Sequence, residues 1–154
     1  MKEKFIKLYM DWAKRASELS HARRLHVGAV IVKDDTVISY GYNGMPAGWD
    51  NNCEYEVTEF QTEYGVGSKL VNTGELKTRP EVLHAESNAI AKLAKSSNSG
   101  LGADLFVTHS PCLECSKLIY QSGIRRVYFG ENYRDDSGIQ FLEKSGVEVN
   151  KIIL

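Results

Sequence analysis

The second half of the sequence alternates short apolar segments with segments of helical periodicity, and this alternation restricts the fold more than any other feature. "ADLFVTH" (103–109), "RRVYFG" (125–130) and "VEVNKIIL" (147–154) have the length and the β-branched content of strands. The segments between them, 112–123 and 136–146, have the spacing of amphipathic helices. Strands joined through helices in this way become parallel neighbours by right-handed crossovers.

The first half adds a helix over residues 2–19, a strand pair over 27–33 and 36–44, and a helix over 80–96. Asp34 and Asp35 separate the paired strands, which is typical of a β-hairpin. The order is therefore α-β-β-α-β-α-β-α-β. This order predicts an α/β fold, a three-layer α/β/α sandwich around a mixed five-stranded sheet.

Residues 45–79 contain several glycines, asparagines and threonines and show no sustained periodicity. We expect a long loop or insertion at about 49–80, with a short helix near "CEYEVTEFQTEYG". A loop of this length in a compact domain is usually functional or mobile. The length of 154 residues suits a single domain, 1–154, that carries this insertion.

The composition excludes several classes of protein. The chain is 42% hydrophobic with a formal net charge of −1, so it has no basic surplus that would favour a nucleic-acid partner. No apolar run approaches the length that crosses a bilayer, and the first residues lack the apolar core of a secretion signal. We expect a cytoplasmic protein without a membrane partner.

Two chemical motifs stand at predicted helix starts. His84 opens one helix, and Pro111 with Cys112 and Cys115 opens the next. The positive end of a helix dipole lowers thiol pKa values and so favours the thiolates that zinc requires. One histidine and two cysteines leave the fourth tetrahedral position of a zinc ion open, which is typical of a catalytic site. Glu86 would then be a base beside the metal rather than a ligand.

Other functions fit parts of this pattern. A Cys-x-x-Cys pair in a reducing compartment is also found in redox proteins, although His84 and a proline before Cys112 argue against a thioredoxin-like couple. A four-ligand structural zinc site could recruit Cys53, and such a chain would be a non-catalytic zinc module that binds nucleotides or a partner. Glu86 argues against that alternative, because a structural site has no use for a base.

The combined pattern H-x-E…P-C-x-x-C is the signature of zinc nucleobase deaminases. Together, "HAESNAI", "THSPCLECSKLIYQSGI", "VGAVIV" and "GYNGMPAG" resemble the deoxycytidylate (dCMP) deaminases over roughly residues 22–146. The resemblance implies a cytidine deaminase-like fold and the hydrolysis of dCMP to dUMP and ammonia. This reaction would supply dUMP for dTMP synthesis. It also implies that Glu86 moves a proton from water to N3 of cytosine and then to the leaving amine.

The resemblance also suggests substrate contacts. The Ala85 N–H would hold the pyrimidine O2, the Ser110 carbonyl would receive the exocyclic amine, and Asn43 would bind the sugar 3′-hydroxyl. Each has a structural alternative, such as a turn asparagine at position 43. The candidates for phosphate binding are Arg24, Tyr133 and Arg134, and His109 is a candidate for a supporting position beside the site.

Members of this family are often hexamers that dCTP activates and dTTP inhibits, with Mg²⁺ accompanying the triphosphate effector. The insertion carries Trp49, Tyr55, Phe60 and Tyr64, aromatic residues suited either to a subunit interface or to packing the insertion onto its own domain. We expect one zinc per chain, because Cys53 is the only cysteine in the insertion and no histidine lies between 49 and 83. Cytidine and tRNA-base deaminases share the zinc motifs, but 19 basic against 20 acidic residues give little support to a tRNA enzyme.

Overall fold

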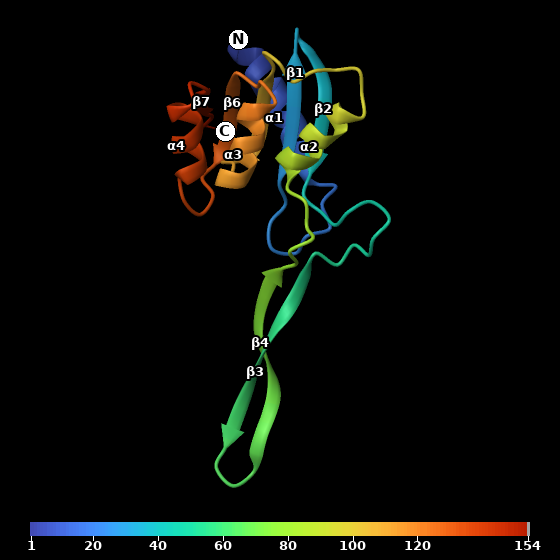
Figure 1. The fold of residues 1–154 in the computed structure, drawn as a ribbon, viewed down its shortest axis with the longest axis vertical. Coiled ribbons are helices and arrows are strands. Elements are labelled where there is room, and N and C mark those ends of the chain that lie inside the picture. Colours follow the sequence, from blue (N-terminus) through green and yellow to red (C-terminus); the bar gives the residue numbers. More distant parts are fainter. Residues whose placement is uncertain (154) are drawn as a thin grey trace.

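The computed structural model describes residues 1–153 and shows a sheet with helices on both faces (Figure 1). Leu154, the end of the last predicted strand, lies outside the described residues. The elements are, in order, α1 (Glu3–Ser17), β1 (Gly28–Lys33), β2 (Thr36–Tyr42), β3 (Glu54–Glu63), β4 (Gly67–Thr78), α2 (Ala85–Ala94), β5 (Asp104–His109), α3 (Leu113–Gln121), β6 (Arg126–Glu131), α4 (Ser137–Lys144) and β7 (Glu148–Lys151).

The main sheet has five strands in the order β2-β1-β5-β6-β7. β1 runs antiparallel to both β2 and β5, whereas β5, β6 and β7 are parallel to one another. Asp34 and Asp35 connect β1 to β2 with φ angles of 49° and 59°, the left-handed backbone that a two-residue type I′ hairpin turn requires. The mixed sheet and the hairpin confirm the prediction from sequence.

The two faces of the sheet are covered by different helices, because neighbouring residues of a strand point to opposite faces. In β1, Val30 packs with α1, whereas Ile31 packs with the helices of the other face. Phe106 of β5 and Tyr128 of β6 join Val30 against Met10 of α1. The opposite face carries α2, α3 and α4. The result is the three-layer α/β/α sandwich that the sequence predicted.

Two glycines allow helices α2 and α4 to approach neighbouring backbone very closely. A Cβ atom on Gly41 of β2 would lie 2.3 Å from the Ala85 oxygen and 2.7 Å from the Ala89 nitrogen of α2. A Cβ atom on Gly138 of α4 would lie 2.1 Å from the Pro111 oxygen. Both distances are far below van der Waals contact. Gly41 therefore allows α2 to pack directly against β2, and Gly138 allows α4 to pack directly against the turn that leads into α3.

The prediction of a long loop with a short helix at 49–80 is wrong, because most of this segment is a β-hairpin of β3 and β4. The hairpin leaves the body of the molecule as a long twisted ribbon (Figure 1). Phe60 lies opposite Leu70, and the turn between the strands uses Gly65 and Gly67 at φ angles of 87° and 93°. Both faces of the ribbon are largely exposed. Strands without a buried face show no apolar alternation, so the sequence pattern was not recognisable.

The helix predicted over 80–96 begins only at Ala85. Before it, Leu83 forms an isolated β-bridge with Gly44, with hydrogen bonds of 2.8 and 3.1 Å in the two directions. This bridge ties the loop after β2 to the residue that precedes His84. Within residues 1–153, none of the helices has the length and apolar character needed to cross a membrane.

Candidate active site

The starts of α2 and α3 bring three potential metal ligands together. His84 is the N-cap residue of α2, Cys112 is the N-cap residue of α3, and Cys115 lies in the first turn of α3. The Nδ1 atom of His84 lies 3.5 Å from the Cys112 sulfur and 3.4 Å from the Cys115 sulfur. All three donor atoms lie within 4.8 Å of one another. The three predicted zinc ligands therefore converge on one point.

This cluster fits zinc by its donors and by its spacing. Bonds of about 2.0–2.3 Å in a tetrahedron place neighbouring ligand atoms roughly 3.5 Å apart, and imidazole with two thiolates is a common zinc donor set. Across residues 1–153 this is the only group of three or more such side chains close enough to share an ion. Cys53 is not part of this group. Its thiol is buried and instead donates a 3.5 Å hydrogen bond to the Asn51 backbone oxygen. A structural site with Cys53 as the fourth ligand is therefore not formed.

The environment of the cysteines favours a thiolate. Hydrogen bonds from Cys115 and from His84 lower the pKa of Cys112 to about 4. The hydrogen bond with Cys112, followed by burial, raises the pKa of the Cys115 thiol. The pair of thiols therefore loses one proton readily, from Cys112, and keeps the other on Cys115. Because zinc binds the deprotonated form, the low pKa of Cys112 favours metal binding.

Glu86, the second residue of α2, lies beside this cluster and is almost completely buried, with 4% of its surface exposed. Burial raises the pKa of its carboxyl to about 7, because a charged carboxylate is costly away from water. A carboxyl with this pKa can both accept and release a proton near neutrality. Glu86 is therefore suited to the predicted role of general base and general acid.

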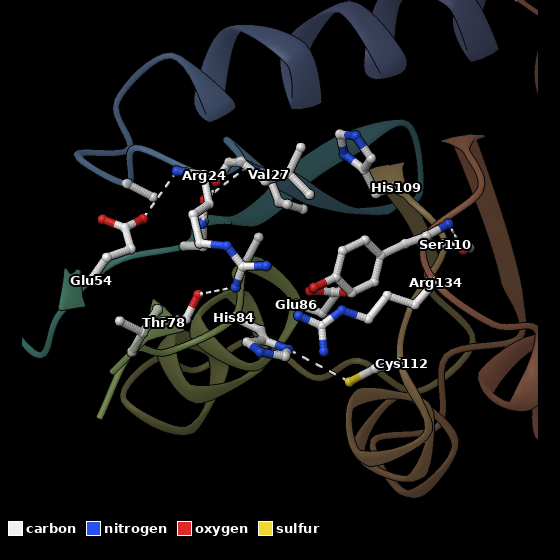
Figure 2. A pocket seen from close by; sticks show the side chains of 16 residues that line it. Arg24, Val27, Glu54, Thr78, His84, Glu86, His109, Ser110, Cys112 and Arg134 are labelled. Carbon is white, nitrogen blue, oxygen red and sulfur yellow. Dashed lines mark hydrogen bonds between the residues drawn. The ribbon is translucent and has the colours of Figure 1, made fainter. Parts of the chain in front are cut away.

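A cavity of about 380 Å³ opens over His84, Glu86 and Cys112 (Figure 2). It lies within the usual range of small-molecule sites, about 300–1,000 Å³. The residues predicted to bind the substrate all line this cavity: Arg24, Asn43, Ala85, Ser110, Tyr133 and Arg134. The structure thus brings together residues that are spread over more than two thirds of the sequence.

The carboxyl ends of β5 and β6 supply one wall of the cavity. Ser110 follows β5, and Tyr133 and Arg134 follow β6; because the strands are parallel, these residues meet at one edge of the sheet. The Ser110 hydroxyl accepts a hydrogen bond of 2.8 Å from the Tyr133 backbone N–H. Arg134 has a φ of 42°, a left-handed conformation that bulky residues rarely adopt. Such strained residues cluster at functional sites.

Asn43 holds the opposite wall in place. Its side-chain oxygen accepts a 2.8 Å hydrogen bond from the Val27 N–H, and its side-chain nitrogen donates one of 2.8 Å to the Leu25 oxygen. Its backbone is not left-handed, unlike that of many turn asparagines. The amide therefore shapes the cavity through the segment before β1. Its predicted contact with the sugar 3′-hydroxyl stays a prediction.

Sequence reasoning gave no role to six residues of the cavity wall: Ala22, Leu25, Val27, Glu54, Thr78 and Val82. Glu54 and Thr78 are far apart in the chain but lie directly opposite each other where the hairpin joins the body. Recognising the hairpin was the only way to find them. His109, predicted to support the site, also lines the cavity; its Nδ1 lies 3.0 Å from the Thr108 hydroxyl, and burial lowers its pKa.

Comparisons with known proteins agree with this geometry. The sequence model of the cytidine and deoxycytidylate deaminase zinc-binding region matches residues 2–131. A crystal structure of dCMP deaminase from the cyanophage S-TIM5, in complex with dCMP and dUMP, superimposes with a TM-score of 0.83. It is 42% identical in sequence, and the match covers 99% of both chains.

Two curated relatives are similar over most of this chain. Deoxycytidylate deaminase of Enterobacteria phage T4 is 34% identical in an alignment 148 residues long, and the match covers 80% of this chain and 77% of the relative. ComE operon protein 2 of Bacillus subtilis is 38% identical over 132 residues, and the match covers 85% of this chain but only 62% of that protein. Since the family pattern extends over residues 2–131 and includes the zinc cluster, the chain belongs to the cytidine and deoxycytidylate deaminase zinc-binding family.

Proposed function

We propose that this protein hydrolyses dCMP to dUMP and ammonia and so supplies dUMP for dTMP synthesis. One observation carries the proposal: a single cavity is lined by His84 and Cys112 of the cluster, by the buried carboxyl of Glu86, and by two arginines, Arg24 and Arg134. The cluster and the carboxyl suit the reacting ring, and the arginines suit a phosphate. The similar S-TIM5 enzyme, crystallised with dCMP and dUMP, supports this substrate.

The residues divide the work of the reaction. His84, Cys112 and Cys115 would hold a zinc ion, which supplies the Lewis acidity that lowers the pKa of a water molecule. Glu86 takes a proton from the water that adds to C4 of cytosine and gives it to N3. It then takes the proton of the new C4 hydroxyl and gives it to the amine, which leaves as ammonia. The C4–N bond breaks at this last step, and uracil remains.

Backbone groups near Glu86 orient the ring. Ala85 is the first residue of α2, so its N–H has no partner within the helix and can donate to the pyrimidine O2. The carbonyl of Ser110, which lies at the end of β5 in the same cavity, is suited to receive the exocyclic amine. Ser110 is buried and bonded to the loop after β6, so its position is fixed before the substrate arrives.

Phosphate recognition predicts a clear substrate preference. Arg24 and Arg134 come from opposite sides and point into the cavity (Figure 2), and both also line the outer groove beside it. The Arg24→Ala and Arg134→Ala variants should each raise KM for dCMP about 10–100-fold, since hydrogen bonds to charged groups contribute about 1.5–3 kcal/mol. Their kinetics with deoxycytidine should stay unchanged. Steady-state assays with both substrates measure this.

The matched control is Arg15→Ala, which removes an exposed arginine paired with Glu18 on α1. It should leave both substrates unaffected. If the unmodified enzyme turned over deoxycytidine as efficiently as dCMP, the phosphate assignment would be wrong and a cytidine deaminase would become the better candidate.

A deaminase of tRNA bases is less well supported. The outer groove beside the cavity has three acidic residues, Glu75, Glu114 and Asp135, against three basic ones, Arg24, Lys77 and Arg134, so it has no basic surplus that would favour a polynucleotide. A non-catalytic zinc module is also disfavoured, because a buried carboxyl beside the metal cluster is costly without a catalytic role. We further propose that the 154 residues form one domain and act in the cytoplasm, where reducing conditions preserve thiolate ligands.

We also propose that the protein is a homo-oligomer, and a hexamer like many of the deaminases that it resembles. In this proposal dCTP activates the enzyme and dTTP inhibits it, with Mg²⁺ bound to the triphosphate. The β3–β4 hairpin supports this association. Phe60 and Leu70 lie side by side on one face and are 76% and 55% exposed, and Tyr64 and Val66 at the tip are also exposed. A two-stranded hairpin is marginally stable by itself in water, so contact with another copy would stabilise it.

The oligomer can be tested by light scattering and by dCMP saturation curves. We expect a mass well above that of one chain and a sigmoidal curve that dCTP makes hyperbolic and dTTP shifts to higher dCMP. Phe60→Ser should lower the mass, whereas Gln61→Ser, on the opposite face of the same strand, should not. A monomer with hyperbolic kinetics that neither triphosphate alters would refute the regulated oligomer and leave the catalytic proposal intact.

A further inference from the structure

The base of the β3–β4 hairpin contains a buried carboxylate that contacts the segment before β1. Glu54, the first residue of β3, is 1% exposed. Its Oε1 atom accepts hydrogen bonds from the backbone N–H groups of Arg23, at 2.8 Å, and Arg24, at 3.1 Å. Its Oε2 atom lies 3.5 Å from Nε of Arg23. A buried charge is tolerated only when it is bonded in this way, so Glu54 fixes the backbone at Arg24.

The other strand of the hairpin holds the side chain of the same arginine. Thr78, the last residue of β4, lies directly opposite Glu54, and its hydroxyl accepts a 3.1 Å hydrogen bond from Nη1 of Arg24. Figure 2 shows Glu54 and Thr78 on the same side of the cavity as Arg24. Arg24 is therefore held at its backbone by one strand and at its guanidinium by the other.

The chemical character of the two partners suits an anion site. The Glu54 carboxylate is directed at backbone N–H groups and at Arg23, not at the guanidinium of Arg24. The guanidinium instead contacts a neutral hydroxyl, so it is oriented without an ion-pair partner in these contacts. An arginine side chain loses rotamer entropy when it is ordered. Ordering Arg24 before the substrate binds removes this cost from binding.

We propose that Glu54 and Thr78 are positioning residues for phosphate binding, and that the base of the hairpin is part of the substrate site through Arg24. This inference rests on the proposed function, in which Arg24 binds the phosphate of dCMP. It assigns a role to a segment that carries no zinc ligand and no catalytic group. The two residues act on the affinity for the monophosphate and not on the chemistry at C4.

The primary test is Thr78→Val, which removes the hydroxyl and keeps the shape. KM for dCMP should rise between about threefold and tenfold, the range expected for one lost hydrogen bond, with kcat unchanged. Deoxycytidine kinetics should not change. Thr78→Ser, which restores the hydroxyl, should recover the normal KM. Thr58→Val, an exposed threonine of the same hairpin, is the control and should have no effect.

A double-mutant cycle separates positioning from a general structural effect. In the Arg24→Ala background, Thr78→Val should cause no further rise in KM, because the group that it orients is already absent. Glu54→Ala should raise KM for dCMP in the same direction, and Glu59→Ala, an exposed glutamate of the same strand, should not.

Two results would overturn the inference: an unchanged KM for dCMP in Thr78→Val, or an equal rise in KM with and without Arg24. Either result is compatible with an enzyme that prefers dCMP to deoxycytidine and that loses this preference in the Arg24→Ala variant. In that case the proposed function would stand and only the role of Glu54 and Thr78 would be refuted. An unmodified enzyme without a preference for the monophosphate would instead refute the phosphate site itself, and the role of the hairpin with it.

Discussion

Glu86→Gln should lose nearly all turnover of dCMP while the protein keeps its zinc and still binds the nucleotide. Glutamine has the size of glutamate but neither accepts nor releases a proton at neutral pH. General acid–base steps contribute about 10²–10⁴-fold to rates, and here one carboxyl serves several proton transfers, so kcat should fall by at least this factor. Because Glu86 is buried, a neutral amide should also be tolerated by the fold. Turnover, zinc content and dCMP binding by calorimetry measure the three quantities separately.

The control for this variant is Glu114→Gln. Glu114 lies in the first turn of α3 and its side chain is 77% exposed in a surface ion pair with Lys117. Its loss should leave kcat within about twofold, as surface ion pairs contribute little. A Glu86→Gln enzyme with a rate near that of the unmodified protein would exclude the proton-transfer role.

Cys112→Ser should lose zinc, activity and the stability that the metal provides. The hydroxyl of serine is a poor zinc ligand at neutral pH, but serine is a favoured N-cap residue and can still accept the Cys115 N–H. The start of α3 should therefore form, and the defect should be chemical. A ligand present at about 1,000 times its Kd stabilises a protein by about 4 kcal/mol, which corresponds to roughly 10 °C in Tm for a chain of this size.

Elemental analysis and thermal unfolding test the zinc prediction. The unmodified protein treated with a chelator is the matched control and should show the same fall in Tm as Cys112→Ser. We expect one zinc per chain in the untreated protein. Two zinc ions per chain would point to a second site that includes Cys53, and full zinc content in Cys112→Ser would remove Cys112 from the ligand set.

The convergence of His84, Cys112 and Cys115 could be predicted from sequence because these residues lie at the starts of two consecutive helices. His84 and Cys112 flank α2 and β5, so the connection between them is short and its topology is fixed by the right-handed crossover rule. The helices were also recognisable, since each buries one side against the sheet. The core strands were recognisable as short continuous apolar runs, since both of their faces are buried.

The hairpin and its contribution to the cavity could not be predicted in this way. β3 and β4 have no buried face, so no apolar alternation marks them, and their glycines resemble those of an irregular loop. The position of Thr78 opposite Glu54 depends on the register of the whole hairpin. The substrate-binding roles of Asn43, Ala85 and the other cavity residues stay predictions, although all of these residues line the cavity.

The close packing at Gly41 and Gly138 affects how loss-of-function data on this protein should be interpreted. Neither residue supplies a metal-ligand atom or lines the cavity, yet neither position has room for a methyl group, because backbone atoms of the segments that carry Ala85 and Cys112 occupy that space. A genetic screen scored only by activity would therefore group both glycines with the zinc ligands. Zinc content and thermal stability, measured on purified variants, distinguish residues that perform the chemistry from residues that only leave space for it.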